Sequence, residues 1–120
     1  MLWFRLASLF MFMAVALGAF GAHALKNKLS TDMLIIFETG VRYQVYHALS
    51  LFFVSWLSQV HLNSYVTAAG WAFTIGISIF SGSLYILSLS GVKGWGAVTP
   101  LGGLAFLVGW LLIFLSSFKH

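Results

Sequence analysis

Four apolar stretches, each about as long as a membrane-crossing helix, occupy most of this 120-residue chain. A transmembrane helix needs about 20 largely apolar residues to cross the hydrocarbon layer of a bilayer. The stretches cover about residues 2–22, 41–60, 65–89 and 99–118, and they leave no room for a separate soluble domain. The sequence therefore predicts an all-α integral membrane protein, a four-helix transmembrane bundle formed as one domain by residues 1–120.

The composition agrees with lipid as the main solvent of the chain. Hydrophobic residues make up 61% and charged residues only 7%, whereas soluble domains carry about a quarter charged residues. The absence of cysteine excludes disulfides and thiolate metal sites. The net charge of +4 comes from dispersed residues, so the chain has no basic block of the kind that binds nucleic acid. A modest positive excess fits contact with anionic lipid headgroups.

Local signals mark where the helices begin. Ser30 can cap the stretch that comes after the first loop, with Asp32 in the first turn near the positive end of the helix. We expect this stretch to form a short amphipathic helix that leads into the second span. Thr99 and Pro100 predict the start of the fourth span, because proline is favoured at the first helical position.

The first span has an alternative interpretation as a secretory signal peptide. Arg5, an apolar run and the small residues around His23 imitate its charged start and cleavage site. The run is longer than a usual signal core, however, and Gly18 and Gly21 suit a helix-packing face. We therefore expect the span to be retained.

The distribution of Lys and Arg predicts the orientation. Four spans place both termini on one side of the membrane, together with Arg5 and Lys119. The opposite side carries Lys26, Lys28, Lys93 and, at a helix boundary, Arg42. The positive-inside rule then places the first and third loops in the cytoplasm and both termini outside. We expect a multi-pass protein of the bacterial plasma (inner) membrane.

Polar side chains concentrate at one end of the predicted spans. In an antiparallel bundle, the end of the first span, the start of the second, the end of the third and the start of the fourth share one side. We expect a polar cluster in that leaflet, available to a ligand. Its candidate members are His23, Glu38, Arg42, Tyr43, Gln44, Tyr46, His47, Ser81, Ser83, Tyr85 and Thr99.

Two interpretations apply to Glu38 and Arg42. They are four residues apart with the acid first, the favourable order for an ion pair on a helix. One interpretation is an interfacial salt bridge that anchors the helix entrance. The other makes Arg42 a ligand for an anion or a lipid phosphate, oriented by Glu38.

His47 also has two interpretations. It can be a neutral imidazole hydrogen-bonded to a neighbouring span, or a proton-accepting group that titrates near neutral pH. His23 and His47 lack the spacing of a metal-binding motif, so we predict no metal site and no cofactor. No serine lies in a nucleophile motif, and no catalytic residue is predicted.

Four segments, taken together, resemble one family. They are Gly18-Ala-Phe-Gly-Ala-His-Ala-Leu25, Phe37-Glu-Thr-Gly-Val-Arg-Tyr-Gln-Val-Tyr-His-Ala-Leu49, Phe80-Ser-Gly-Ser-Leu-Tyr85 and Thr99-Pro-Leu-Gly-Gly103. They resemble domain-of-unknown-function family 423, the YgdD/YwdK-type small membrane proteins, whose eukaryotic relatives are similar to transmembrane protein 256. The resemblance covers nearly the whole chain. It implies a small protein with about four spans, and it supplies no activity and no catalytic residue.

Three functions compete at this point. The first is a non-enzymatic membrane component that presents the polar cluster to a lipid headgroup or to a partner, either another membrane protein or a second copy of the chain. The second is a small proton-coupled transporter, which needs a membrane-embedded carboxylate, whereas Glu38 lies near an interface. The third is a lipid- or quinone-modifying enzyme that uses His47 and Tyr43 as acid–base groups. We expect the first, with membrane lipids as partners and no role for nucleic acid.

Overall fold

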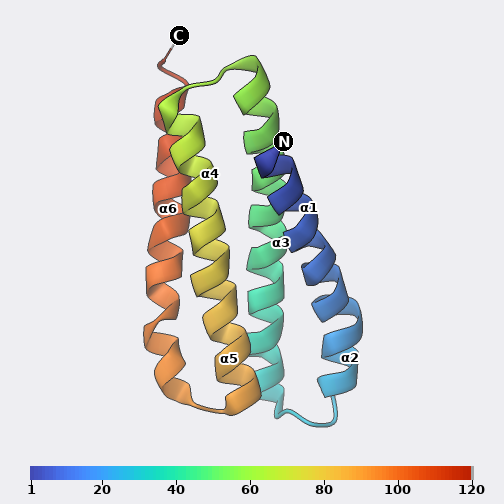
Figure 1. Ribbon diagram of the computed structural model, residues 1–120. Helices are drawn as coiled ribbons and strands as arrows, with labels where there is room; N and C mark the ends of the chain where they lie inside the picture. The colour runs from blue at the N-terminus through green and yellow to red at the C-terminus, as the bar shows by residue number, and fades with distance from the viewer. Residues whose placement is uncertain (120) are drawn as a thin grey trace.

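The computed structural model describes residues 1–119, and the regular structure within them is entirely helical. Four antiparallel helical rods run along a molecule that measures 52 × 26 × 16 Å (Figure 1). In chain order the elements are α1 (Leu2–Val15), the π-helical segment η1 (Ala16–Gly21), α2 (Ala22–Leu25), α3 (Thr31–Val60), α4 (Ser64–Gly76), the π-helical segment η2 (Ile77–Ser81), α5 (Gly82–Ser90), the 3-10 turn η3 (Lys93–Ala97) and α6 (Thr99–Ser116). The prediction of an all-α protein is confirmed.

Three of the rods are long and apolar enough to cross a membrane. They are Leu2–Leu25, Ser64–Ser90 and Lys93–Ser116, close to three of the four predicted spans. The fourth rod, α3, has 30 residues and is therefore about 45 Å long at 1.5 Å per residue. In the described chain α3 is not among the helices apolar enough to cross on composition alone, because Glu38, Arg42 and their polar neighbours lie in it.

The predicted short amphipathic helix before the second span is wrong as a separate element. The backbone N–H of Met33 donates to Ser30 Oγ at 3.2 Å, as the predicted cap requires. From that cap α3 continues without interruption from Thr31 to Val60. Gly40 is the only strong helix breaker in this range, and its cost of about 1 kcal/mol is too small to end a helix packed on both sides.

The rods are arranged in order across the molecule. In Figure 1, α1 lies beside α3, α3 beside α4 and α5, and α6 on the far side of α4. The most extensive packing is between α4 and α6 and between α1 and α3. Trp3 of α1 and Phe106 of α6 join one apolar core with residues of α3, α4 and η2. At the end opposite the two termini, where the connections after α2 and after α5 lie, the first and last rods lie apart. We call this the loop end.

Apolar residues of α3 make close contacts with the first rod. A methyl group added at Gly18 would lie 3.1 Å from Val41 Cγ1, and one added at Gly21 would lie 3.4 Å from Phe37 Cζ. Arg42 and Tyr46 are exposed. Gln44 and His47 of the same helix are buried, so burial on α3 does not separate apolar from polar residues. In lipid, close packing rather than the hydrophobic effect decides which faces of the helices meet.

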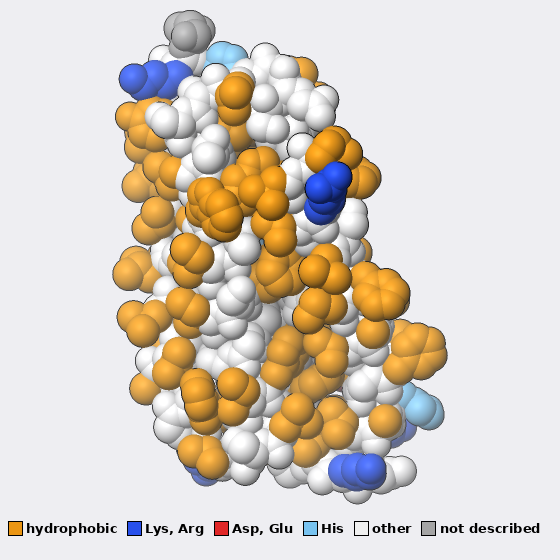
Figure 2. Space-filling model, viewed as in Figure 1, with side chains coloured by type: hydrophobic (Ala, Val, Ile, Leu, Met, Phe, Trp, Pro, Cys, Tyr) orange, Lys and Arg blue, Asp and Glu red, His pale blue; other side chains and the backbone are white. Residues whose placement is uncertain are grey.

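The flank of the molecule is apolar. In Figure 2, hydrophobic side chains cover the length of the visible face, and Lys and Arg side chains lie towards its two ends. Phe12, Phe20 and Leu107 are each at least two-thirds exposed. A soluble protein rarely leaves so much apolar surface open to solvent, so this flank suits contact with lipid acyl chains.

Candidate functional site

The candidate polar residues separate into several groups in the structure and do not form one cluster. Gln44, Ser81 and Tyr85 meet between three rods; His47 joins an aromatic group; Ser83 meets Thr99; Glu38 and Arg42 line a surface recess; His23 and Tyr46 are exposed. The predicted single cluster is therefore wrong in its geometry. The physical reason is the arrangement of the rods, because α1 and α6 lie on opposite sides of the structure at the loop end.

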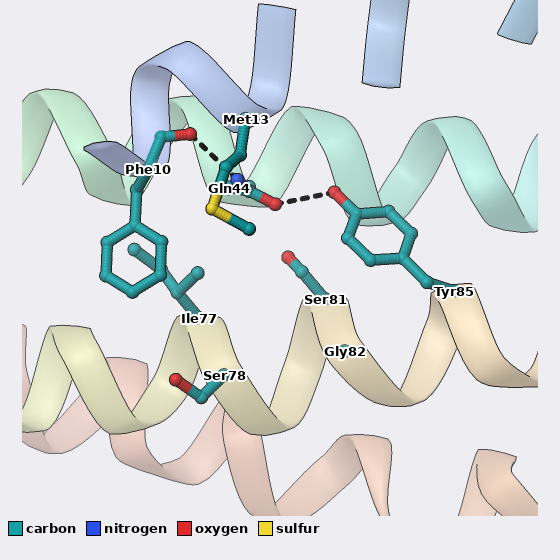
Figure 3. A pocket seen from close by; sticks show the side chains of 8 residues that line it. All are labelled: Phe10, Met13, Gln44, Ile77, Ser78, Ser81, Gly82 and Tyr85. Atoms are coloured by element: carbon teal, nitrogen blue, oxygen red, sulfur yellow. Dashed lines mark hydrogen bonds between the residues drawn. The ribbon is translucent and has the colours of Figure 1, made fainter. Parts of the chain in front are cut away.

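Gln44 is the centre of the first group. It is buried, at 2% exposure, near the middle of α3. Its Nε2 donates to the backbone carbonyl of Phe10 at 2.7 Å, and its Oε1 accepts from the hydroxyl of Tyr85 at 2.7 Å (Figure 3). Ser81 Oγ adds a bond of 2.7 Å to the carbonyl of Gly40. These bonds connect α3 to α1 on one side and to η2 and α5 on the other.

His47 is fixed as a neutral imidazole. Its Nδ1 lies 2.9 Å from the carbonyl oxygen of Tyr43, which can only accept, so Nδ1 carries the proton. Its Nε2 accepts from Trp110 Nε1 at 3.2 Å, and its ring stacks on Phe106 with centroids 3.5 Å apart. Since both ring nitrogens have partners, the structure favours a histidine that joins two helices over a proton acceptor.

The sequence analysis missed Trp110, which lies on α6 far from the expected polar end. Its indole N–H is the donor to His47. A signal was available, because a tryptophan within a transmembrane stretch needs an acceptor for its N–H. The sequence could not identify the acceptor, since four antiparallel helices allow several pairings.

Ser83 and Thr99 connect α5 to α6 near the loop end. Their hydroxyl oxygens are 2.6 Å apart, and Ser83 also donates to the carbonyl of Phe80 at 2.9 Å. Ser83 is buried and Thr99 is half-buried, whereas most residues of the connection between α5 and α6 are exposed. This pair is fully explained by helix packing.

Glu38 and Arg42 line a recess of about 260 Å³ together with Gly18 and Val41. We call it the Arg42 recess. The predicted salt bridge is wrong, because within residues 1–119 no side-chain N···O approach of 4.0 Å or less joins these two residues. Arg42 is exposed and Glu38 is half-buried.

His23 and Tyr46 lie at the surface, and the Tyr46 ring packs edge-on against Tyr43 with centroids 5.6 Å apart. His23 is exposed on α2, and Tyr46 is 53% exposed on α3. In the described part of the chain, no three His, Asp or Glu side chains gather as metal ligands would. Tyr43 is 38% exposed, with its ring packed on Phe80 at a centroid distance of 4.6 Å.

The Arg42 recess and a second recess each contain residues of a π-helical segment. Gly18 of η1 lines the Arg42 recess. Ile77, Ser78 and Ser81 of η2 line the second recess, beside Gln44 and Tyr85. A π-helical turn inserts an extra residue and is frequent at functional sites. Sequence periodicity does not reveal such a turn, so this feature was not predicted.

Comparison with known proteins gives a consistent relationship. A family profile described as "protein of unknown function (DUF423)" matches residues 17–103. The chain is 48% identical over 109 residues to the UPF0382 membrane protein YwdK of Bacillus subtilis, covering 90% of this chain and 89% of that protein. It is 45% identical over 115 residues to a UPF0382 membrane protein of Staphylococcus haemolyticus, covering 95% and 93%. No solved structure matches.

Proposed function

This chain belongs to the DUF423 family of membrane proteins, and on that premise we propose that it is a non-enzymatic, multi-pass component of the bacterial plasma membrane that binds a phospholipid headgroup in the Arg42 recess. The observation that carries the proposal is that Glu38 and Arg42 line one recess without forming an ion pair with each other.

The proposal treats α3 as the fourth membrane crossing. This helix packs along α1 on one side and along α4 and α5 on the other, and those rods are apolar enough to cross. A helix held lengthwise between two spans shares their depth. The count of Lys and Arg then places the loops after the first and third rods in the cytoplasm and both termini outside.

The position of the recess suits a headgroup. Arg42 is the twelfth residue of α3, and its Cα is therefore about 16 Å along the helix from Thr31. Cα–Cβ bonds tilt towards the start of a helix, and a long arginine side chain extends further in that direction to reach the interface. The start of α3 is at the loop end, so the guanidinium reaches towards the headgroups of that leaflet.

The chemistry of the recess selects a phosphate. A charge in the apolar layer costs about 2.5–3.5 kcal/mol at mid-depth unless it is paired. The planar fork of a guanidinium matches two phosphate oxygens. The carboxylate of Glu38 matches an ammonium group, which phosphatidylethanolamine carries beside its phosphate and phosphatidylglycerol lacks. We therefore expect phosphatidylethanolamine to bind more tightly than phosphatidylglycerol.

Lipid binding to the purified full chain tests this function. Defined phospholipids are titrated against the protein in detergent, and bound lipid is counted by native mass spectrometry. We expect Arg42→Gln to weaken the binding of both lipids about tenfold or more, equivalent to about 1.4 kcal/mol. Glu38→Gln should remove only the preference for phosphatidylethanolamine.

Arg5→Gln is the matched control, because it removes the same charge from an exposed residue near the other end of the molecule. If Arg42→Gln and Arg5→Gln lose equal affinity, the effect is a general loss of positive charge and the site does not exist. If wild-type protein carries no phospholipid after mild extraction, the proposed function is wrong.

A further inference from the structure

A second recess, of about 210 Å³, lies on the side of α3 that faces α5. We call it the Tyr85 recess. Figure 3 shows Phe10 and Met13 of α1 on one side, Ile77 and Ser81 of η2 on the other, and Gln44 and Tyr85 between them. Phe10, Met13 and Ile77 supply apolar walls, and the polar side chains are those of Gln44, Ser78, Ser81 and Tyr85.

Hydrogen bonding to the backbone fixes the orientation of Gln44. The carbonyl oxygen of Phe10 can only accept, so the atom of Gln44 that lies 2.7 Å from it must be the amide nitrogen. The amide oxygen then faces Tyr85, and the Tyr85 hydroxyl must donate to it. A hydroxyl has one hydrogen, so Tyr85 Oη has only lone pairs to offer to anything else.

The serine hydroxyls of this recess also donate their single hydrogen to another group of the protein. Ser81 Oγ donates to the carbonyl of Gly40 at 2.7 Å, and Ser78 Oγ donates to the carbonyl of Thr74 at 2.9 Å. Their single hydrogens are already used, and their lone pairs remain. All three hydroxyls at this recess are therefore acceptors towards a ligand.

The recess also has no charge to offer. None of its lining side chains belongs to Asp, Glu, Lys, Arg or His, so a charged headgroup placed there would be unpaired and costly. Hydroxyl oxygens that can only accept are matched by a hydrogen-bond donor, and apolar walls are matched by a hydrocarbon chain. These requirements describe an uncharged amphiphile that ends in a hydroxyl group.

From this complementarity we propose that the Tyr85 recess binds a neutral lipid alcohol, such as a diacylglycerol or a prenyl alcohol. Its O–H donates to Tyr85 Oη, and its chain lies against Met13 and Ile77. The occupant enters from the membrane, past the exposed Ser78 at the edge of the recess.

A pair of probes tests the donor requirement. Short-chain 1,2-diacylglycerol and the same molecule with its hydroxyl methylated are titrated against the purified chain, and complexes are counted by native mass spectrometry. The two probes differ in one hydrogen-bond donor, which is worth about 0.6–1.7 kcal/mol between membrane helices. We expect the alcohol to bind about three- to twentyfold more tightly than the methyl ether.

Variants localise the binding to the recess. Gly82 lines it, and a methyl group added there would meet nothing within 4 Å, so Gly82→Leu adds apolar bulk at the recess from a position with free space for its Cβ. It should abolish binding of both probes. Ala68→Leu adds comparable apolar bulk at an exposed position of α4 and should change nothing. Tyr85→Phe should remove the difference between the two probes.

The outcomes separate this site from the phospholipid site. Arg42→Gln should leave diacylglycerol binding unchanged, so either site can fail alone. Equal binding of the alcohol and the methyl ether overturns the donor argument. Binding that survives Gly82→Leu, or binding of neither probe, shows that the recess holds only water or acyl chains. A changed oligomeric state in Gly82→Leu shows a helix contact, and the proposal is then wrong.

Discussion

Replacing Gly102 by alanine provides the sharpest test of the packing between α6 and η2. A methyl group added at Gly102 would lie 2.7 Å from both Cα and Cβ of Phe80. Ordinary contacts begin at 3.4 Å. Because part of the obstacle is backbone, no side-chain rotation removes it. The backbone nitrogen of Phe80 lies closer still, so one helix must move by at least about 0.7 Å, the difference between these distances.

The energetic effect results from that displacement. A gap of 0.5–1 Å removes about a quarter to a half of each atomic contact, which is worth about 0.1–0.2 kcal/mol when intact. For a patch with as many contacts as one buried leucine, about 40–60, mid-range values give a loss of about 2–3 kcal/mol. This agrees with the range of about 1–3 kcal/mol for overpacked cores.

Gly82→Ala is the matched control, because it makes the same chemical change at a helical position where the methyl group meets nothing within 4 Å. The intrinsic gain of about 1 kcal/mol for Gly→Ala in a helix is common to both variants and cancels in their comparison. The difference between the two variants is therefore the packing term alone.

The free energy of unfolding of both variants can be measured by steric trapping in bicelles. We expect Gly102→Ala to be about 2–3 kcal/mol less stable than Gly82→Ala. A difference below about 0.5 kcal/mol, the usual error in comparing distant sites, would refute the close approach of α6 to η2.

Three further predictions concern hydrogen bonds. In a double-mutant cycle of Gln44→Leu with Tyr85→Phe, the coupling in unfolding free energy should be about 0.6–1.7 kcal/mol, and zero coupling would exclude their bond. Asn63→Ala should lower the free energy of unfolding by about 1 kcal/mol, because Asn63 Oδ1 caps α4. Asn63→Ser should be at least as stable as wild type, since it keeps the cap and removes a buried Nδ2 that has no partner. Trp110→Phe should lower the free energy of unfolding by about 1 kcal/mol. In the double variant with His47→Phe it should cause no further loss, and additive losses would refute the hydrogen bond between Trp110 and His47.

The sequence predicted the helices better than their arrangement. Apolar length identifies the rods, and the cap at Ser30 and the proline at Pro100 identify where two of them begin. It did not predict that α3 continues without a break, because a single Gly40 gives no clear signal either way. Which rods are neighbours depends on small residues meeting large ones, as Gly76 meets Phe106. Many such pairings are compatible with one hydropathy pattern.

The candidate site was predicted in part. Gln44, Ser81 and Tyr85 were among the expected residues, and the structure brings them together. Arg42 and His47 were expected beside them, yet they point to different surroundings. Helix periodicity gives the angle of a side chain around its own axis. It does not say which neighbouring helix fills that angle, and the π-helical turns change the angle again.

Those wide turns also decide where the chain tolerates a change of length. Each residue of an α-helix advances the winding by about 100°, whereas a π-helical turn holds one extra residue. Deleting one residue within η2 would therefore restore an α-helical turn and leave Tyr85 directed at Gln44. The same deletion within α4, away from the wide turn, removes no extra residue and would rotate the residues that follow by about 100°, so it should be far more damaging.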